Sequence, residues 1–350
     1  MLRFLLIFCL AHFSLALDCN QIIDSVIYDG STVWLPNGFS DPQTIPANFN
    51  CTYLIPAPAN LTAGLYANLT ISNGLKGVND YIFVTTGYGY STKLDSRSGS
   101  PYQNLIIPGS QISVQIVTKS VFMYSKVGIT VEYHGAHVGS PTPMMTGGNM
   151  NYLDIKSLSM SNNSSMLGTV TYSCDEPISI SIATFINDVI NRNYRYIIDG
   201  PITNQTKIYS MWDIISLPIL TTTNFVTIVF WYGDDLQFVM NTKTEAEQFS
   251  QLYSRALKSH PQHFIMSTYG MNYTLAEEMI NFDSVGIKID NLKVESNPCK
   301  AYVVSGPPNN SSQVLLDFSK NVTMPQNFEL KYLTVIEEDC VFTFDASTGN

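Results

Sequence analysis

Two pairs of histidines have a spacing that could bind a metal ion. His134 and His137 lie three residues apart, as do His260 and His263. Zinc sites use such pairs when a helix or turn holds them and two further ligands lie nearby. The first pair lies at the start of a Gly- and Pro-rich segment, and Pro261 interrupts the second pair, so neither pair has the helix or turn and the two further ligands that zinc needs. We therefore expect solvated or packed histidines, with no metal site and no cofactor.

Adjacent carboxylates raise the alternative of a hydrolase. Asp234 and Asp235 follow an apolar segment, but a glycosidase needs two carboxyl groups that face each other across a sugar cleft. Neighbouring residues in a turn point apart, and Gly233-Asp234-Asp235 has turn composition. Residues 337–339, Glu-Glu-Asp, likewise predict a solvated hairpin turn. No catalytic residue is therefore assigned, and a secreted hydrolase that uses the second-half carboxylates stays the alternative.

The common catalytic sequence motifs are missing from the chain. It has no Gly-x-Ser-x-Gly, no His-Glu-x-x-His and no glycine-rich phosphate loop. The sequence therefore favours a protein that is not an enzyme.

The first 16 residues predict a secretory signal peptide. Arg3 precedes a short run of Phe, Leu and Ile that ends at Ser14-Leu15-Ala16. A membrane anchor would need about 20 apolar residues, and no later stretch reaches that length without polar residues. We therefore expect secretion to the extracellular space, with no transmembrane segment.

Secretion gives meaning to the Asn-x-Ser/Thr sequons, which are glycosylated only in the secretory route. Charged residues make up 13% of the chain, so glycans would supply part of its solubility. The candidate glycosylation sites are Asn50, Asn60, Asn68, Asn162, Asn163, Asn204, Asn272, Asn309, Asn310 and Asn321.

The net charge argues against nucleic acid as a partner. The formal charge is −10, and loss of Arg3, the one charged residue among the first 16, makes it −11. Binding to phosphate backbones depends on clustered Lys and Arg, and the cations of this chain form no block. An extracellular protein or glycan is the expected ligand.

Cysteine usage predicts two disulfides. After removal of Cys9 with the signal peptide, five cysteines remain, which should pair in an oxidising compartment. Cys19 with Cys51 and Cys299 with Cys340 are the preferred pairs, because each closes a loop within one half of the chain. Cys174 is then unpaired, either as a buried thiol or as the link in a disulfide-linked oligomer.

The first half of the chain predicts short antiparallel strands. Residues 79–87 alternate, with Tyr81 and Phe83 on one face and Asp80, Ile82 and Val84 on the other. Gly-, Pro- and Asn-rich turns separate the strands, which favours a β-sandwich, although a barrel has the same pattern. The predicted strands are residues 33–35, 51–55, 65–71, 81–85, 105–107, 112–118 and 127–133.

A Gly- and Pro-rich segment predicts a domain boundary at residues 136–148, between domains at 17–135 and 149–350. The second domain is expected to be β-rich, with one or two helices. Capping boxes at Thr244/Glu247 and Thr274/Glu277 predict helices over residues 244–258 and 274–280. Residues 194–200 weakly repeat residues 80–87, so a second sandwich of the same kind as the first and an unrelated β-rich domain both stay open. The predicted strands of this half are residues 168–174, 178–184, 194–198, 225–232, 285–289, 301–304, 314–318, 328–335 and 340–344.

Several segments of the chain carry a family resemblance. They are Cys19, the segments 50–56 and 79–84, Gly87, the closing segment 128–133, and the Gly-Pro-Pro-Asn-Asn-Ser-Ser run at residues 306–312. Together they resemble the CUB-like domain of a large group of nematode secreted proteins, over residues 18–135 and the later run. The resemblance implies a jelly-roll-like β-sandwich, an extracellular non-enzymatic role, and association with innate immune or pathogen-defence responses, and it leaves a second CUB-like domain open for the later half.

The resemblance also raises a calcium site. Many CUB domains bind calcium through three acidic positions, of which Asp80 matches the middle one, while Ser72 and Lys119 fall near the other two. Calcium takes six to eight oxygen ligands, so one carboxylate beside a cation makes a poor site. The alternative role for Asp80 is that of a hydrogen-bond acceptor.

Tyrosines near the turn that follows this strand are the remaining candidates for binding. Tyr88, Tyr90 and Tyr102, together with Asp80, form the candidate binding residues, because exposed Tyr suits glycan or protein contacts and loops on a rigid sandwich carry recognition. The sequence therefore predicts a secreted, disulfide-stabilised glycoprotein that acts by binding, with a hydrolase or a structural matrix component as alternatives.

Overall fold

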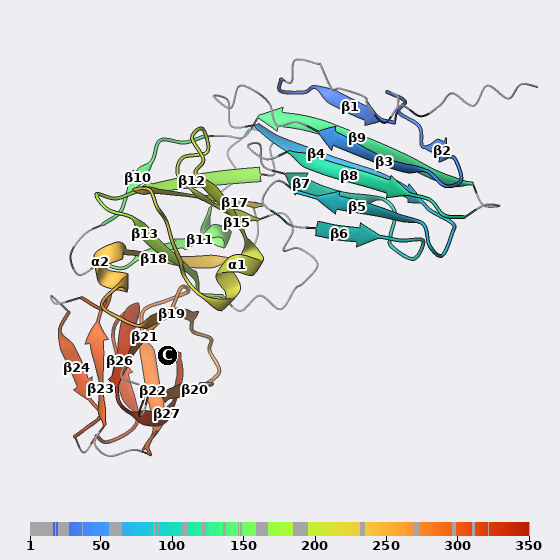
Figure 1. Cartoon of the computed structure of the whole chain (residues 1–350). Helices are drawn as coiled ribbons and strands as arrows, with labels where there is room; N and C mark the ends of the chain where they lie inside the picture. Colours follow the sequence, from blue (N-terminus) through green and yellow to red (C-terminus); the bar gives the residue numbers. More distant parts are fainter. Residues whose placement is uncertain are drawn as a thin grey trace, which may run out of the picture. The chain divides into compact units, whose positions relative to one another are not determined.

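The computed structural model (Figure 1) describes residues 17, 19, 28–36, 38–55, 65–86, 89, 91–106, 111–120, 124–135, 138–145, 147, 149–158, 167–184, 195–231, 235–268, 270, 273–295, 299–309, 312–320 and 322–349. The predicted signal peptide lies outside these residues. The chain divides into two compact units, the first ending at His134 and the second continuing from Gly135.

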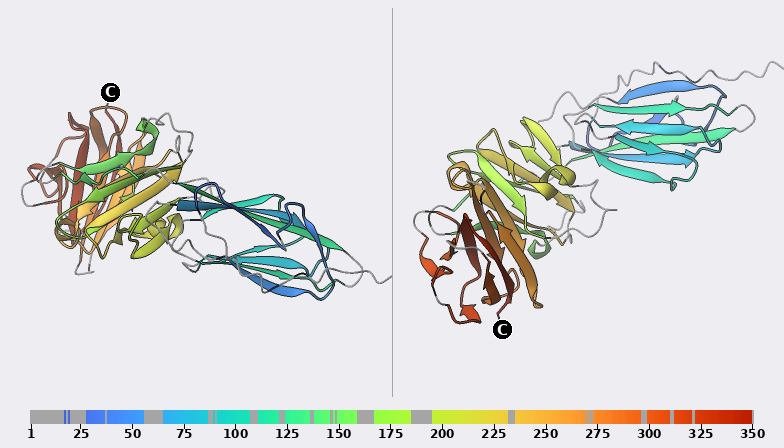
Figure 2. Two further views of the ribbon diagram at one scale, coloured as in Figure 1. Left: turned by 90° about the horizontal axis from the view of Figure 1, so that it is seen from above. Right: turned by 60° about the horizontal axis from the view of Figure 1, so that its bottom comes forward.

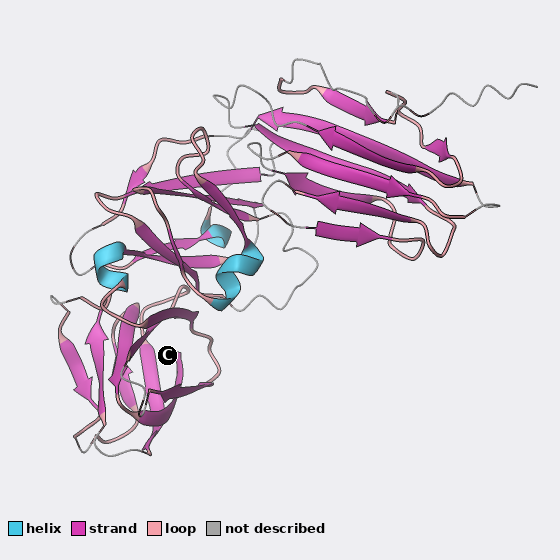
Figure 3. Ribbon diagram, in the orientation of Figure 1, coloured by secondary structure: helices cyan, strands magenta, loops and turns pink. Residues whose placement is uncertain are grey.

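Strands dominate both units, and the described helices are short (Figure 3). The prediction of a mainly β protein is confirmed.

The first unit is a sandwich of two antiparallel sheets, whose layers separate in the left view of Figure 2. One sheet has the order β1-β9-β4-β7, with β2 also paired to β9, and the other has the order β3-β8-β5-β6. Their strands are β1 (Thr32–Leu35), β2 (Gln43–Ile45), β3 (Asn50–Ile55), β4 (Leu65–Gly74), β5 (Tyr81–Thr85), β6 (Ser91–Leu94), β7 (Tyr102–Ile106), β8 (Ile112–Val117) and β9 (Ser125–Gly135).

The core of the first unit lies between these sheets. Strand β5 shows why: Ile82 and Val84 are buried, whereas Tyr81 and Phe83 are half-buried on its other face. This is the alternation that the sequence predicts. Inward-facing side chains of both sheets join one apolar cluster, which includes Leu69 and Ile129 from one sheet and Tyr53 and Val114 from the other.

The second unit contains four sheets, which form two sandwiches. The second sandwich packs the sheet β10-β12-β17-β14-β15 against the sheet β11-β18-β13-β16. Strand β10 lies in the predicted linker and pairs in parallel with β12. The elements are β10 (Thr142–Pro143), β11 (Asn151–Asp154), a 3-10 turn (Ile155–Ser157), β12 (Leu167–Ser173), β13 (Ile178–Ile182), β14 (Tyr196–Asp199), β15 (Lys207–Ser210), α1 (Met211–Ser216), β16 (Ile219–Leu220), β17 (Phe225–Trp231), β18 (Gln237–Thr242) and α2 (Lys243–Ala246).

The third sandwich packs the sheet β19-β21-β26-β23-β24 against the sheet β20-β27-β22-β25. Its core is rich in aromatic rings, with Phe264 and Phe344 stacked at 5.0 Å between centroids. The strands are β19 (Gln251–Ala256), β20 (Gln262–Ser267), β21 (Thr274–Ile280), β22 (Ile287–Val294), β23 (Lys300–Ser305), β24 (Val314–Asp317), β25 (Gln326–Phe328), β26 (Tyr332–Glu338) and β27 (Val341–Thr348).

The predicted helix over residues 244–258 is wrong beyond its first turn. Helix α2 ends at Ala246, and its capping box uses Thr242 and Glu245 rather than Thr244 and Glu247. Residues 251–256 form β19, which pairs in parallel with β21. Leu252 and Ser254 are buried on one face of that strand, so tertiary pairing overrides the helical spacing of the apolar residues.

The predicted helix over residues 274–280 is also wrong. These residues form β21, which lies between β19 and β26 in its sheet.

The predicted solvated turn over residues 337–339 is wrong for Glu337, because this residue is fully buried in β26. Only Asp339 of the predicted turn has a left-handed backbone, with φ 46°. The pairing of β21 with β26 therefore buries Glu277 and Glu337, although charged side chains usually lie in solvent.

Candidate functional site

Asp80 lies at the start of β5 and is enclosed by hydrogen-bond donors. Its Oδ1 accepts from the amides of Lys119 (2.8 Å) and Ser120 (3.1 Å) and from the Ser120 hydroxyl (3.0 Å). Its Oδ2 accepts from the Ser125 hydroxyl at 2.8 Å and the Gly77 amide at 3.2 Å. Five donors therefore occupy the carboxylate, which is 1% exposed.

These contacts give Asp80 a structural role. Burial by itself raises the pKa of Asp80, but the Lys119 amide and the hydroxyls of Ser125 and Ser120 outweigh it and hold that pKa below its ordinary value. The carboxylate ties the loop before β5 to the segments that follow β8 and begin β9. Of the two roles that the sequence left open, the geometry supports the hydrogen-bond acceptor.

Gly77 is required by the same cluster. A Cβ at this position would lie 1.6 Å from Oγ of Ser120 and 2.6 Å from Cγ of Asp80. Only glycine lets the backbone approach the carboxylate this closely.

The candidate tyrosines are not brought together with Asp80. Tyr102 lies in β7, in the sheet opposite β5, and packs partly against the core. Burial raises the pKa of Tyr102. Tyr88 and Tyr90 lie outside the described residues, so their part in binding stays a prediction.

The sequons differ in how free their side-chain amides are. Asn50 and Asn204 are exposed, and Asn68 is half-buried with Nδ2 3.5 Å from Glu132. Nδ2 of Asn309 donates to the Gly147 carbonyl and to Oε1 of Glu245, each at 3.1 Å. A glycan on Asn309 would replace one of the two Nδ2 hydrogens, so at least one of these bonds would be lost. The remaining sequons lie outside the described residues: Asn60, Asn162, Asn163, Asn272, Asn310 and Asn321.

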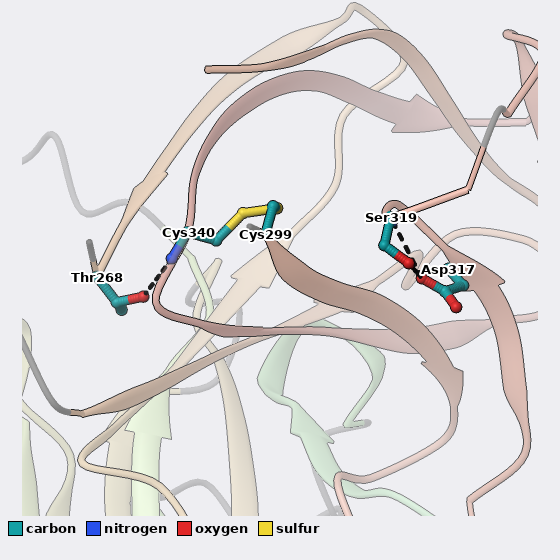
Figure 4. Close-up of a disulfide and its surroundings, with 5 residues drawn as sticks. All are labelled: Thr268, Cys299, Asp317, Ser319 and Cys340. Carbon is teal, nitrogen blue, oxygen red and sulfur yellow. Dashed lines mark hydrogen bonds between the residues drawn. A yellow bond between two sulfur atoms is a disulfide. The ribbon is translucent and has the colours of Figure 1, made fainter. Parts of the chain in front are cut away.

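Both predicted disulfides are present, Cys19–Cys51 in the first unit and Cys299–Cys340 in the third sandwich. Figure 4 shows the second bond beside Thr268, whose Oγ1 accepts from the Cys340 amide at 3.2 Å. Cys174 is unpaired among the described residues and packs half-buried against the core of the second sandwich.

The hydrolase alternative gains little from the structure. Asp235 is exposed, and Asp234 lies outside the described residues. Across the described residues, no three His, Cys, Asp or Glu side chains are grouped so that they could hold a metal ion. The described helices include none long and apolar enough to cross a membrane.

A cleft in the third sandwich is a second candidate site. It has a volume of about 380 Å³ and lies between β19 and β20, which are edge strands of opposite sheets. Strand β21 provides its floor. Its lining side chains include Tyr253, Arg255, Gln262, Phe264 and Glu277.

An ion pair organises the cleft. Nε of Arg255 donates to Oε1 of Glu277 at 3.2 Å, and the guanidinium carbon lies 5.7 Å from the centroid of the Phe264 ring. The Arg255 side chain is 41% exposed and that of Glu277 only 8%. Burial raises the pKa of Glu277, which the charge and hydrogen bond of Arg255 only partly offset.

Sequence reasoning missed Arg255 and Glu277 as site residues because both were assigned to predicted helices. Leu252 and Ser254 alternate in burial with Tyr253 and Arg255, but the residue types themselves do not alternate, so the sequence carries no period-2 signal for this strand. The pairing of β19 with β21, which brings Arg255 to Glu277, has no local sequence signature.

The family described as "CUB-like domain" matches residues 14–136 of the chain. The chain therefore contains a CUB-like domain, which corresponds to the first unit. No curated protein matches the chain.

Solved structures give only distant similarities. The CUB1-EGF-CUB2 domains of rat MASP-1 match at 11% identity over 92% of this chain and 98% of that chain, with a TM-score of 0.23. The CUB1-EGF-CUB2 domain of human MASP-1/3 matches at 11% identity over 92% and 100%, with a TM-score of 0.24. A structure of Sulfolobus Turreted Icosahedral Virus matches at 12% identity over 93% and 91%, with a TM-score of 0.23. TM-scores of this size do not establish a shared overall arrangement.

Proposed function

We propose that this protein is a secreted glycoprotein that acts by extracellular recognition in an innate immune or pathogen-defence response. In this proposal it is one of the nematode secreted CUB-like proteins that its sequence resembles. It binds a protein or glycan and does not turn its ligand over.

The CUB-like domain closed by Cys19–Cys51 carries the proposal. CUB-like domains commonly serve extracellular binding, and disulfides persist in oxidising compartments. The second disulfide, Cys299–Cys340, gives the same support from the other unit. The exposed sequons Asn50 and Asn204 fit passage through the secretory route.

Two surfaces are candidates for recognition under this proposal. One is the loop from Tyr88 to Tyr102 in the first unit, and the other is the cleft between β19 and β20. Cys174 could additionally link copies through an intermolecular disulfide, which a non-reducing gel of the secreted protein would show.

The test is expression of the full chain in secreting cells, followed by binding of the secreted protein to arrays of microbial and host glycans, with calcium or with a chelator. We expect glycosylated protein in the medium and a calcium-independent array signal. Retention of the protein inside the cell would contradict the secretory part of the proposal. Silence on every array would move the proposed ligand from a glycan to a protein.

A further inference from the structure

The cleft between β19 and β20 has the construction of a small-ligand site. Its volume of about 380 Å³ falls in the lower part of the range for ligand pockets, about 300–1,000 Å³. Three strands form it, and two of them belong to opposite sheets of one sandwich. A site on strands is held more rigidly than a site on loops. The Cys299–Cys340 disulfide lies in the same sandwich and stabilises it.

The polar groups of the cleft include both donors and an acceptor. Among the described residues the Arg255 guanidinium bonds only through Nε, so its two Nη groups are available as donors. Gln262 accepts from the Lys258 amide through Oε1 at 3.1 Å, which leaves its Nε2 as a further donor. Glu277 provides the acceptor at the floor.

The charges select against ionic ligands. Arg255 and Glu277 carry opposite charges side by side. A cationic ligand is therefore repelled by the guanidinium, and an anionic ligand is repelled by the carboxylate. Asp345 adds a second negative charge near the rim, where it bonds Nδ1 of His263 at 2.8 Å. A neutral hydroxyl group avoids both conflicts, because it can accept from Arg255 and donate to Glu277 at once.

Aromatic rings complete the lining. Tyr253 and Phe264 lie on the two edge strands and both line the cleft. Tyr253 donates its hydroxyl hydrogen to Gln251 at 3.2 Å, which fixes its polar tip. An aromatic side chain offers a rigid apolar face on which the C–H face of a ring-shaped ligand can pack.

We propose that this cleft binds a neutral, hydroxyl-rich ring of hexose size, that is, one uncharged sugar unit of a glycan. The inference rests on the proposed recognition function and gives it a site and a ligand class. Arg255 and Gln262 donate to sugar hydroxyls, Glu277 accepts from one, and the Tyr253 ring contacts the apolar face of the sugar. Phe264, stacked on Phe344 and covered by the Arg255 guanidinium, supports that guanidinium from behind.

The experiment is calorimetric titration of the full-length secreted protein with methyl glycosides: neutral hexoses, a uronic acid and an amino sugar without its acetyl group. Arg255→Gln removes the guanidinium donors. Gln262→Ala tests the rim without touching the ion pair, so it keeps the test decisive if Arg255→Gln fails to fold. Lys300→Gln is the matched control, because Lys300 is an exposed cation of the same sandwich that lies outside the cleft lining, with Nζ 3.5 Å from Glu338.

We expect binding of at least one neutral hexose, with affinity reduced at least tenfold by Arg255→Gln, reduced about threefold or more by Gln262→Ala, and unchanged by Lys300→Gln. Preference for the charged sugars, equal affinity in all variants, or no sugar binding would overturn the cleft proposal. The same protein is applied to the arrays. An array signal that survives Arg255→Gln and Gln262→Ala would overturn the cleft and leave the recognition function standing, whereas no binding to any glycan or protein partner would remove the function itself.

Discussion

Asn241 and Glu278 meet in the buried junction between the second and third sandwiches, where Nδ2 of Asn241 lies 3.1 Å from Oε2 of Glu278. Ser254 donates to the same carboxyl oxygen at 2.7 Å and lies 2.6 Å from the hydroxyl of Ser181. Oδ1 of Asn241 and Oε1 of Glu278 are buried with no hydrogen-bond partner among the described residues. A proton on Glu278 removes the buried charge and adds a donor, whereas an ionised carboxylate is buried with Oε1 unsatisfied.

Stability is therefore expected to depend on pH. Burial is the main cause that raises the pKa of Glu278 from 4.5 to about 7, with smaller contributions from the charges of Glu245 and Glu277, in spite of the opposing hydrogen bonds of Ser254 and Asn241. Between these values the folded protein holds a proton that the unfolded chain releases. The stabilisation is complete below about pH 4.5 and is lost as the pH rises through 7.

The measurement is chemical unfolding at several pH values between 5 and 8. Glu278→Gln keeps the hydrogen bonds of a neutral side chain but cannot titrate. The slope of the free energy of unfolding against pH should therefore fall by about 1.4 kcal/mol per pH unit, which is the contribution of one proton. Glu337, whose pKa burial also raises to about 7, keeps a similar slope in the variant. An identical pH profile in wild type and Glu278→Gln would show that Glu278 is not protonated.

Gly77→Ala should destabilise the first unit by about 3 kcal/mol, because the added Cβ enters the Asp80 cluster and the structure must shift. Gly99→Ala is the control, since nothing lies within 4 Å of a Cβ at Gly99. The measurement is thermal unfolding of the two variants, and we expect a lower midpoint for Gly77→Ala than for Gly99→Ala. Equal midpoints would mean that the cluster does not hold Asp80 as described.

Loss of the Cys299–Cys340 disulfide should cost about 4 kcal/mol on the loop-entropy account, because the bond spans 41 residues. The double variant Cys299→Ser with Cys340→Ser is compared with Cys174→Ser, which removes only an unpaired thiol. Urea unfolding of the secreted protein measures both. A double variant as stable as Cys174→Ser would refute a structural role for the bond.

Glycan occupancy should differ between two sequons. Asn204 is exposed and should carry a glycan, whereas Nδ2 of Asn309 is engaged with Gly147 and Glu245. Enzymatic deglycosylation converts a modified Asn to Asp, which peptide mass spectrometry detects. We expect the conversion at Asn204 and none at Asn309. Conversion at Asn309 would show that its two hydrogen bonds are not both formed when the glycan is attached.

Most strands of the first unit could be predicted because they carry their own signal, although the short strands β2 and β6 were missed. In β5, alternation alone separates the buried Ile82 and Val84 from Tyr81 and Phe83. The disulfides could also be predicted, since pairing within each half leaves Cys174 over.

The candidate cleft could not be predicted, because it depends on pairing between distant strands. Glu277 belongs to a Thr-x-x-Glu pattern that suits a helix start, yet its segment forms a strand flanked on both sides in the sheet. The energy of such pairing comes from cross-strand neighbours and burial, which local propensity does not contain. The same reason explains why Glu337 was expected in solvent and lies in the core.

The central claim is that the protein recognises a ligand without changing it. The most direct measurement is to hold the secreted protein with the glycan that gives its strongest array signal, with calcium or with a chelator, and to recover the glycan for mass spectrometry. The account predicts retention of the glycan under both conditions and recovery of its full mass. A glycan recovered in cleaved form, with cleavage abolished by Asp234→Asn and Asp235→Asn together, would contradict the account and establish the hydrolase instead.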